Sequence, residues 1–102
     1  MYKLTDEKRE RVAELCRRFH VRRLDLFGSA AGLDFDPSRS DVDVLVEFDT
    51  LGEGMYVDAW FGLHAALEEL FARPVDLVSA AAVRNPYFRA ELERTRRVLY
   101  AA

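Results

Sequence analysis

The stretch from residue 24 to residue 46 constrains the fold more than any other part of the chain. An apolar run begins at Leu24 and is broken by Gly28-Ser29; after eleven further residues the sequence continues Asp41-Val-Asp43-Val-Leu-Val. This pattern predicts two short strands separated by a turn and a loop. Because successive strand residues point to opposite faces, Asp41 and Asp43 share one face of the second strand, about 7 Å apart along it.

These residue types point to phosphate chemistry. At Gly28-Ser29 a small turn can bring backbone N–H groups close to a phosphate. A two-metal phosphoryl-transfer site holds its ions about 3.5–4 Å apart, so that Asp41 and Asp43, reaching inward from either side, can bind such a pair. A phosphate cradle beside a pair of metal-binding carboxylates is what a nucleotidyltransferase requires.

Asp76 is a third candidate because it interrupts the apolar strand pattern Val75-Asp-Leu-Val78. If this strand lies beside the second strand, Asp76 joins Asp41 and Asp43 on one face. Three carboxylates about 7 Å apart repel by roughly 2 kcal/mol per pair at an effective dielectric constant near 20. Such a cluster is tolerated if solvent screens it, if a proton is shared, or if a divalent cation occupies it.

Each of these signals alone has an ordinary structural explanation. A single Asp-x-Asp is more often a solvated strand face, and a Gly-Ser pair is more often a turn that ends a strand. The order of the signals is more specific, because each lies at a strand and Asp76 follows on a third one. We therefore favour the functional interpretation of the combined pattern.

Hydrophobic periodicity predicts three helices. Thr5 is the expected N-cap of the first, and Asn85-Pro86 begins the last, which runs to about Arg97. The middle helix is expected from about Met55 to Phe71. Residues of the expected buried stripes in the first and middle helices are Val12, Leu15, Cys16, Phe19, Tyr56, Trp60, Leu63, Leu67 and Leu70.

Strands are expected at residues 21–27, 41–48 and 75–78, with a short edge strand at 98–100. The order of helices and strands implies an α/β (α+β) fold with a small mixed sheet of three to four strands. Helices should pack mainly on one face of that sheet. At 102 residues the chain is expected to form a single domain, residues 1–102.

The net charge of −3 conceals a segregation along the chain. Residues 1–23 carry eight Lys/Arg and four acidic residues, a net charge of +4. Residues 24–80 carry two Arg and twelve acidic residues, a net charge of −10. Residues 81–102 carry five Arg against two acids, a balance of +3. The acidic middle segment would repel a nucleoside triphosphate unless a cation is present. The basic ends favour solvated helix faces or a protein partner over direct nucleic-acid binding.

The single cysteine, Cys16, excludes an internal disulfide and is expected to be a small core residue rather than a nucleophile. The longest apolar runs are too short to span a membrane, and no membrane partner is expected. The residues from Met1 to Lys8 lack the apolar segment of a secretory signal. These features predict a cytoplasmic protein.

At the residues singled out above, the chain resembles the minimal nucleotidyltransferase (MNT) family, small members of the DNA polymerase β-like superfamily. The family signature is a Gly-Ser turn, a short spacer, Asp-x-Asp and a later strand aspartate. Its counterparts here are Gly28-Ser29, Asp41-Val-Asp43 and Asp76. The tail at residues 83–89 also resembles the C-terminal helix of the family, so that the similarity covers nearly the whole chain.

The resemblance implies the nucleotidyltransferase fold and a set of roles. Gly28 and Ser29 would bind the phosphates of ATP, and Asp41, Asp43 and Asp76 would be the catalytic residues that hold magnesium, with two ions expected. It also implies a partner, because such proteins are paired with a HEPN-domain toxin in toxin–antitoxin modules. The MNT protein is the antitoxin, and in some pairs it transfers AMP from ATP to a tyrosine of the toxin.

One departure from the family keeps alternatives open. Family members usually carry Arg-Gly shortly after Gly-Ser, whereas this chain has Ala30-Ala-Gly-Leu33. Arg39 is a candidate to replace the missing cation in space. The first alternative is an antitoxin that neutralises its HEPN partner by complex formation alone. The second is a transferase that acts on RNA or on a small molecule.

Overall fold

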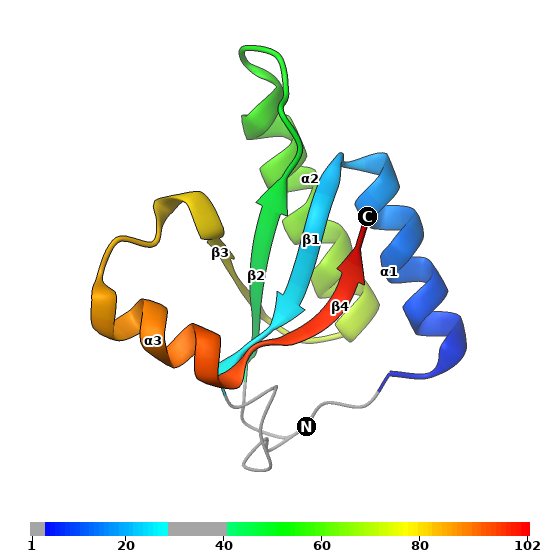
Figure 1. Ribbon diagram of the computed structural model, residues 1–102. Coiled ribbons are helices and arrows are strands. Elements are labelled where there is room, and N and C mark those ends of the chain that lie inside the picture. Colours follow the sequence, from blue (N-terminus) through cyan, green and yellow to red (C-terminus); the bar gives the residue numbers. More distant parts are fainter. Residues whose placement is uncertain (1–3, 29–40) are drawn as a thin grey trace.

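The computed structural model describes residues 4–28 and 41–102 (Figure 1). Side-chain caps set the starts of two of its helices. The N-cap Thr5 accepts a hydrogen bond from the Lys8 backbone at 3.2 Å, and the Asn85 side chain accepts from the Tyr87 and Phe88 backbones. The elements in chain order are α1 (Asp6–Arg18), β1 (Val21–Leu26), β2 (Val42–Phe48), α2 (Met55–Phe71), β3 (Val75–Ser79), the short 3-10 turn η2 (Ala80–Ala82), α3 (Pro86–Thr95) and β4 (Arg97–Ala101).

The four strands form one mixed sheet in the order β3-β2-β1-β4 (Figure 1). β2 runs parallel to β3, and β1 is antiparallel to both β2 and β4. The register of the parallel pair places Asp43 directly opposite Asp76. The mixed sheet predicted from the sequence is confirmed, and β4 forms the edge beside β1.

The sheet has a hydrophobic core on each face. The larger core packs α1 and α2 against residues such as Val42, Val44 and Val46, which alternate along β2. In Figure 1 these two helices lie behind the sheet, whereas α3 lies in front of it. A smaller core on the front face joins Leu45 of β2 to Leu92 of α3. Helices thus pack mainly, but not only, on one face, as predicted.

Two sequence-based expectations about the helices are wrong. Tyr56 is 45% exposed, because it lies in the first turn of α2, before Ala59, the first buried residue of that helix. The Tyr56 ring instead contacts Phe48, with ring centroids 6.3 Å apart. The last helix ends at Thr95 rather than near Arg97, because the extended backbone of Arg96 leads into β4.

Cys16 is fully buried in the larger core, between α1 and the sheet. Burial raises the pKa of its thiol to about 12, although the nearby charge of Arg17 acts in the opposite direction. A thiol with this pKa is protonated at neutral pH and is a poor nucleophile. The interpretation of Cys16 as a small core residue is confirmed. In the described part of the chain, no helix combines the length and the apolar character needed to cross a membrane.

A buried ion pair joins the last part of the chain to the first strand. Asp25 of β1 has no exposed surface, and its carboxylate accepts hydrogen bonds from Arg23 Nε at 3.1 Å and from Arg96 Nε at 2.5 Å. Arg96 also pairs with Glu93 at 3.1 Å. Because Arg96 stands between α3 and β4, this contact fixes the position of both elements on the sheet.

We predict that Asp25→Ala lowers the free energy of unfolding by about 3 kcal/mol. The substitution leaves the Arg96 guanidinium without its buried counter-charge, and breaking one side of a buried pair is strongly destabilising. Urea denaturation measures the change. Arg94→Ala is the control, because the Arg94–Glu91 pair is exposed and its loss should leave the unfolding midpoint unchanged. Equal midpoints for Asp25→Ala and the wild type would contradict the structural role of Asp25.

Candidate functional site

Three carboxylates face the side of the sheet opposite α1 and α2. Asp41 immediately precedes β2 and Asp43 lies within it, and the intervening Val42 is fully buried in the larger core. Asp76 lies opposite Asp43 on β3, between Val75 and Leu77, which are buried in the same core. The structure therefore brings together the three aspartates singled out from the sequence. We call Asp41, Asp43 and Asp76 the site carboxylates.

The site carboxylates interact with one another through their charges. The pKa of Asp43 is raised first by burial and then by the charges of Asp76 and Asp41. Among the described residues, none donates a hydrogen bond or forms an ion pair with any of the three. The negative charge of the site carboxylates is therefore not neutralised by the described part of the protein, and the charged form of Asp43 is disfavoured.

Gly28 brings the turn after β1 against Asp43. Its φ of +62° lies in the left-handed region that favours glycine. A Cβ atom added to Gly28 would lie 2.8 Å from Asp43 Oδ2, so that a side chain here would displace the carboxylate. The predicted phosphate-binding turn and the predicted metal-binding aspartate are thus in direct contact. Ser29, Ala30-Ala-Gly-Leu33 and Arg39 lie outside the described residues.

The Gly28 amide is held by the end of α3. Its N–H donates to Thr95 Oγ1 at 3.3 Å, and the Thr95 hydroxyl in turn donates to the Glu91 carbonyl at 2.9 Å. In this structure the Gly28 N–H therefore has a partner within the protein and stabilises the turn. Sequence analysis did not identify Thr95, because the two residues are 67 positions apart and no local pattern links them.

The donor atoms of the site suit magnesium. In the parts of the chain that the structure describes, no three His, Cys, Asp or Glu side chains form a ready-made metal cluster. Magnesium is commonly bound through one or two protein carboxylates together with water and substrate phosphates. A set of unneutralised carboxylates beside a glycine turn fits a cation that binds together with a phosphate ligand better than it fits a closed structural metal site.

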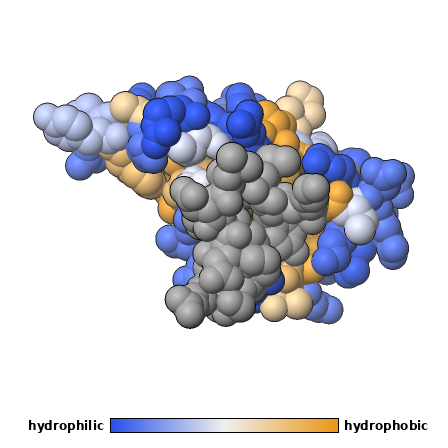
Figure 2. Space-filling view, turned by 90° about the horizontal axis from the view of Figure 1, so that it is seen from below, coloured by the Kyte–Doolittle hydropathy of each residue, from blue (hydrophilic) through white to orange (hydrophobic). Residues whose placement is uncertain are grey.

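β1 ends and β2 begins at the lower edge of the sheet in Figure 1, so the site lies at this end of the molecule. Figure 2 views the molecule from there and shows many hydrophilic residues on this face. Asp41 and Asp76 are exposed, whereas Asp43 is half-buried. Two of the site carboxylates are thus open to solvent, as binding of a charged ligand requires.

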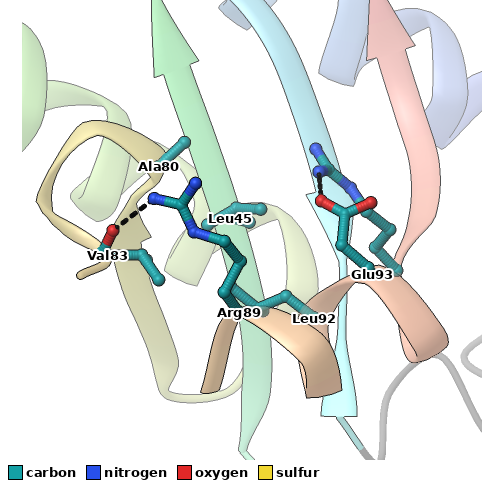
Figure 3. A pocket seen from close by; sticks show the side chains of 7 residues that line it. Leu45, Ala80, Val83, Arg89, Leu92 and Glu93 are labelled. Atoms are coloured by element: carbon teal, nitrogen blue, oxygen red, sulfur yellow. Dashed lines mark hydrogen bonds and ion pairs between the residues drawn. The ribbon is translucent and has the colours of Figure 1, made fainter. Parts of the chain in front are cut away.

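A small cavity lies between α3 and the sheet on the same face (Figure 3). It has a volume of about 180 Å³. Arg89 reaches into this region and donates to the Val83 carbonyl at 2.8 Å, while Arg96 pairs with Glu93 and Asp25. Since both guanidinium groups bind within the protein, we assign these arginines to the attachment of α3. The lining residues are Leu45, Ala80, Val83, Arg89, Leu92, Glu93 and Arg96.

Comparison with known sequences identifies relatives over most of the chain. The family model described as "Nucleotidyltransferase domain" matches residues 8–99. Two proteins of Methanocaldococcus jannaschii, MJ0128 and MJ1379, are each named "putative protein adenylyltransferase". MJ0128 is 31% identical over 90 residues, which cover 88% of either chain. MJ1379 is 30% identical over 76 residues, or 74% of either chain.

Solved structures show the same fold. A chain described as a "putative minimal nucleotidyltransferase" is 34% identical with a TM-score of 0.71, and the match covers 89% of this chain and 88% of that one. The MNT antitoxin complex with a tri-AMPylated HEPN toxin of Shewanella oneidensis gives 20% identity and a TM-score of 0.63, covering 97% of this chain and 74% of that one. A toxin–antitoxin structure with AMP-PNP gives 22% identity and a TM-score of 0.65, covering 92% and 73%.

The latter two similarities, at this low identity, concern the fold alone. The family model and the two archaeal relatives match by sequence, and the range that the family model spans, residues 8–99, contains Gly28 and all three site carboxylates. The resemblance that the Gly-Ser and Asp-x-Asp residues suggested is confirmed at the level of the family. The chain belongs to the nucleotidyltransferase domain family.

Proposed function

We propose that this protein transfers AMP from ATP to a protein hydroxyl, and that the acceptor is a tyrosine of a HEPN toxin that it neutralises as the antitoxin. The close approach of the Gly28 turn to Asp43 is the main observation behind this proposal, because it puts the turn that we propose to bind phosphate beside the site carboxylates. The names of the archaeal relatives and the AMPylated toxin in a structure of the same fold support the choice of acceptor.

The proposed reaction is a single displacement at the α-phosphorus of ATP. The acceptor oxygen forms a bond to this phosphorus, and the bond from the phosphorus to the bridging oxygen of the β-phosphate breaks. Pyrophosphate leaves with the bonding electron pair. The hydroxyl proton passes to a nearby carboxylate, for which Asp76 is our candidate because it is exposed at the edge of the site.

Asp41 and Asp43 are the proposed ligands of two magnesium ions, and Asp76 completes the site on the acceptor side. Bound magnesium supplies positive charge that neutralises the phosphates and the charge that develops in the transition state. Gly28 allows the phosphates to approach the backbone, and Ser29 is proposed to bind a phosphate oxygen. Catalysis would then depend mainly on positioning and on electrostatic stabilisation.

A second candidate function is neutralisation of the toxin by complex formation without catalysis. The sequence supports this alternative, because Ala30-Ala-Gly-Leu33 lacks the arginine that family members usually place after Gly-Ser. Under this alternative the protein binds its partner equally well with or without ATP. The two functions differ in one measurable product, the adenylylated partner.

We predict that incubation with a cognate HEPN protein, ATP and magnesium adds AMP units to a partner tyrosine, detected by intact-mass spectrometry and peptide sequencing. Asp43→Asn should lower the rate by at least about a hundredfold, because it weakens binding of the magnesium that would offset the negative charge of the transition state, and it should leave the complex intact on size exclusion. If the wild type neutralises the toxin but adds no mass, complex formation alone is the mechanism.

The raised pKa of Asp43 predicts a pH-dependent stability change. Without metal, the folded state binds the Asp43 proton more tightly than the unfolded state does, so stability falls as the pH rises above the ordinary value of 3.8 and through the folded pKa. Asp43→Asn should therefore raise the melting temperature near pH 7, and the gain should disappear as the pH falls below 3.8.

Magnesium should reverse the difference in melting temperature between the wild type and Asp43→Asn. It should raise the melting temperature of the wild type by binding the folded state, and it should raise that of Asp43→Asn much less. Differential scanning fluorimetry with and without magnesium gives both comparisons. A wild type that is unaffected by magnesium, with or without ATP, would contradict a metal site at Asp43.

Gly28 provides a test of the turn with a matched control. Gly28→Ala and Gly54→Ala both place a side chain at a positive φ, +62° and +83°, so that both carry similar backbone strain. An added Cβ contacts Asp43 at position 28, whereas it meets no atom within 4 Å at position 54. Only Gly28→Ala should weaken ATP binding in the presence of magnesium, by about tenfold or more, measured by calorimetry. Equal affinities for the two variants would exclude the turn from the ATP site.

A further inference from the structure

The first half of α2 exposes large apolar side chains. Met55, Tyr56, Val57 and Phe61 are 46%, 45%, 60% and 65% exposed. Val57 and Phe61 lie off the stripe of α2 that enters the larger core, whereas Tyr56 lies at the N-terminal end of that stripe, before Ala59, the first buried residue of the helix. α2 therefore has two apolar sides, of which the sheet covers one.

This second side forms a groove rather than isolated side chains. A cavity of about 300 Å³ opens there between α2 and the ends of β2 and β3. Contiguous apolar surface of this kind is typical of a site that binds another molecule. We call its lining residues the α2 groove: Phe48, Tyr56, Val57, Trp60, Phe61 and Ser79.

The charges near the α2 groove are acidic. Residues 47–72 contain no Lys or Arg. Glu47 and Asp49 flank the groove residue Phe48, and Arg22 offsets their charges through ion pairs at 3.2 and 3.4 Å. Glu53 and Asp58 are exposed, and no described residue forms an ion pair with either. A complementary partner would offer apolar side chains bordered by Lys or Arg.

We infer that the α2 groove docks an apolar segment of the partner protein that is bordered by basic side chains. A second copy of this chain fits the groove poorly, because a symmetric contact would bring Glu53 and Asp58 of both copies to the same interface. The inference rests on the proposed function, in which a HEPN toxin is the partner, and names the surface that holds it.

The position of the groove agrees with a docking role. Asp43 and Phe48 are five residues apart on β2, which separates the site carboxylates from the groove by about 16 Å along the strand. A partner held at the groove would leave the site carboxylates open to an acceptor side chain. The basic C-terminal end is less suitable for docking than the sequence suggested, because Arg94 and Arg96 pair within the chain.

The test compares Phe61→Ser with Tyr87→Ser in binding to a co-expressed cognate HEPN protein. Both side chains are exposed, Tyr87 at 86%, but Tyr87 lies on α3 and not at the groove. Calorimetry should show at least tenfold weaker binding for Phe61→Ser and unchanged binding for Tyr87→Ser, with the melting temperature of each variant close to that of the wild type. Asp58→Lys should slow association, and added salt should reduce this effect.

Two further readouts separate docking from the proposed chemistry. Phe61→Ser should bind ATP and magnesium like the wild type, whereas Asp43→Asn should bind the partner but lose the effect of magnesium. Wild-type affinity of Phe61→Ser for the partner would overturn the groove assignment and leave the proposed function intact. Self-association of the wild type that Phe61→Ser abolishes would assign the groove to a second copy instead. Absence of any complex between the wild type and the HEPN protein would overturn both.

Discussion

The parallel pairing of β2 with β3 is the constraint on which the rest of the structure depends. Parallel neighbours require a crossover connection, and α2 provides it by packing on one face of the sheet. The residues of β2 and β3 that point toward α2 must then be apolar. The alternate residues, Asp43 and Asp76, are left on the opposite face in register with each other. The connection that completes the core thus also places two like charges side by side.

Asp25 and Asp43 both lie on the face of the sheet opposite α1 and α2, but their surroundings differ. Asp25 on β1 is completely buried, and two guanidinium groups bind it. Asp43 on the neighbouring strand β2 meets other carboxylates, which together with burial raise its pKa. A protein that needed Asp43 only for stability would do better with an uncharged residue. The lack of compensation at Asp43, rather than its burial, is therefore what supports our proposal that it binds a ligand.

The sequence predicted those features that depend on neighbouring residues. Alternation along residues 41–48 identified the apolar and acidic faces of β2, and helical spacing placed Cys16 in the core. The contacts of Gly28 with Thr95 and of Asp25 with Arg96 span 67 and 71 positions, and no local pattern encodes them. The spacing of Tyr56 matches the buried stripe of α2, but Tyr56 lies in the first turn, before the first buried residue Ala59, and its side chain stays 45% exposed. Local periodicity determines the orientation of a side chain but not whether another element lies above it.

Two consecutive residues at the end of α3 bind β1 and the turn that follows it. Thr95 accepts a hydrogen bond from the Gly28 amide, and Arg96 donates to Asp25. These contacts should therefore open and close together when α3 leaves the sheet, as one cooperative unit of local unfolding. The Gly28 amide proton is protected only while the Thr95 hydroxyl accepts it. Its rate of exchange with deuterium in the solvent would thus report how often α3 detaches, and would connect the local unfolding of a helix that is remote in sequence to the geometry of the glycine turn.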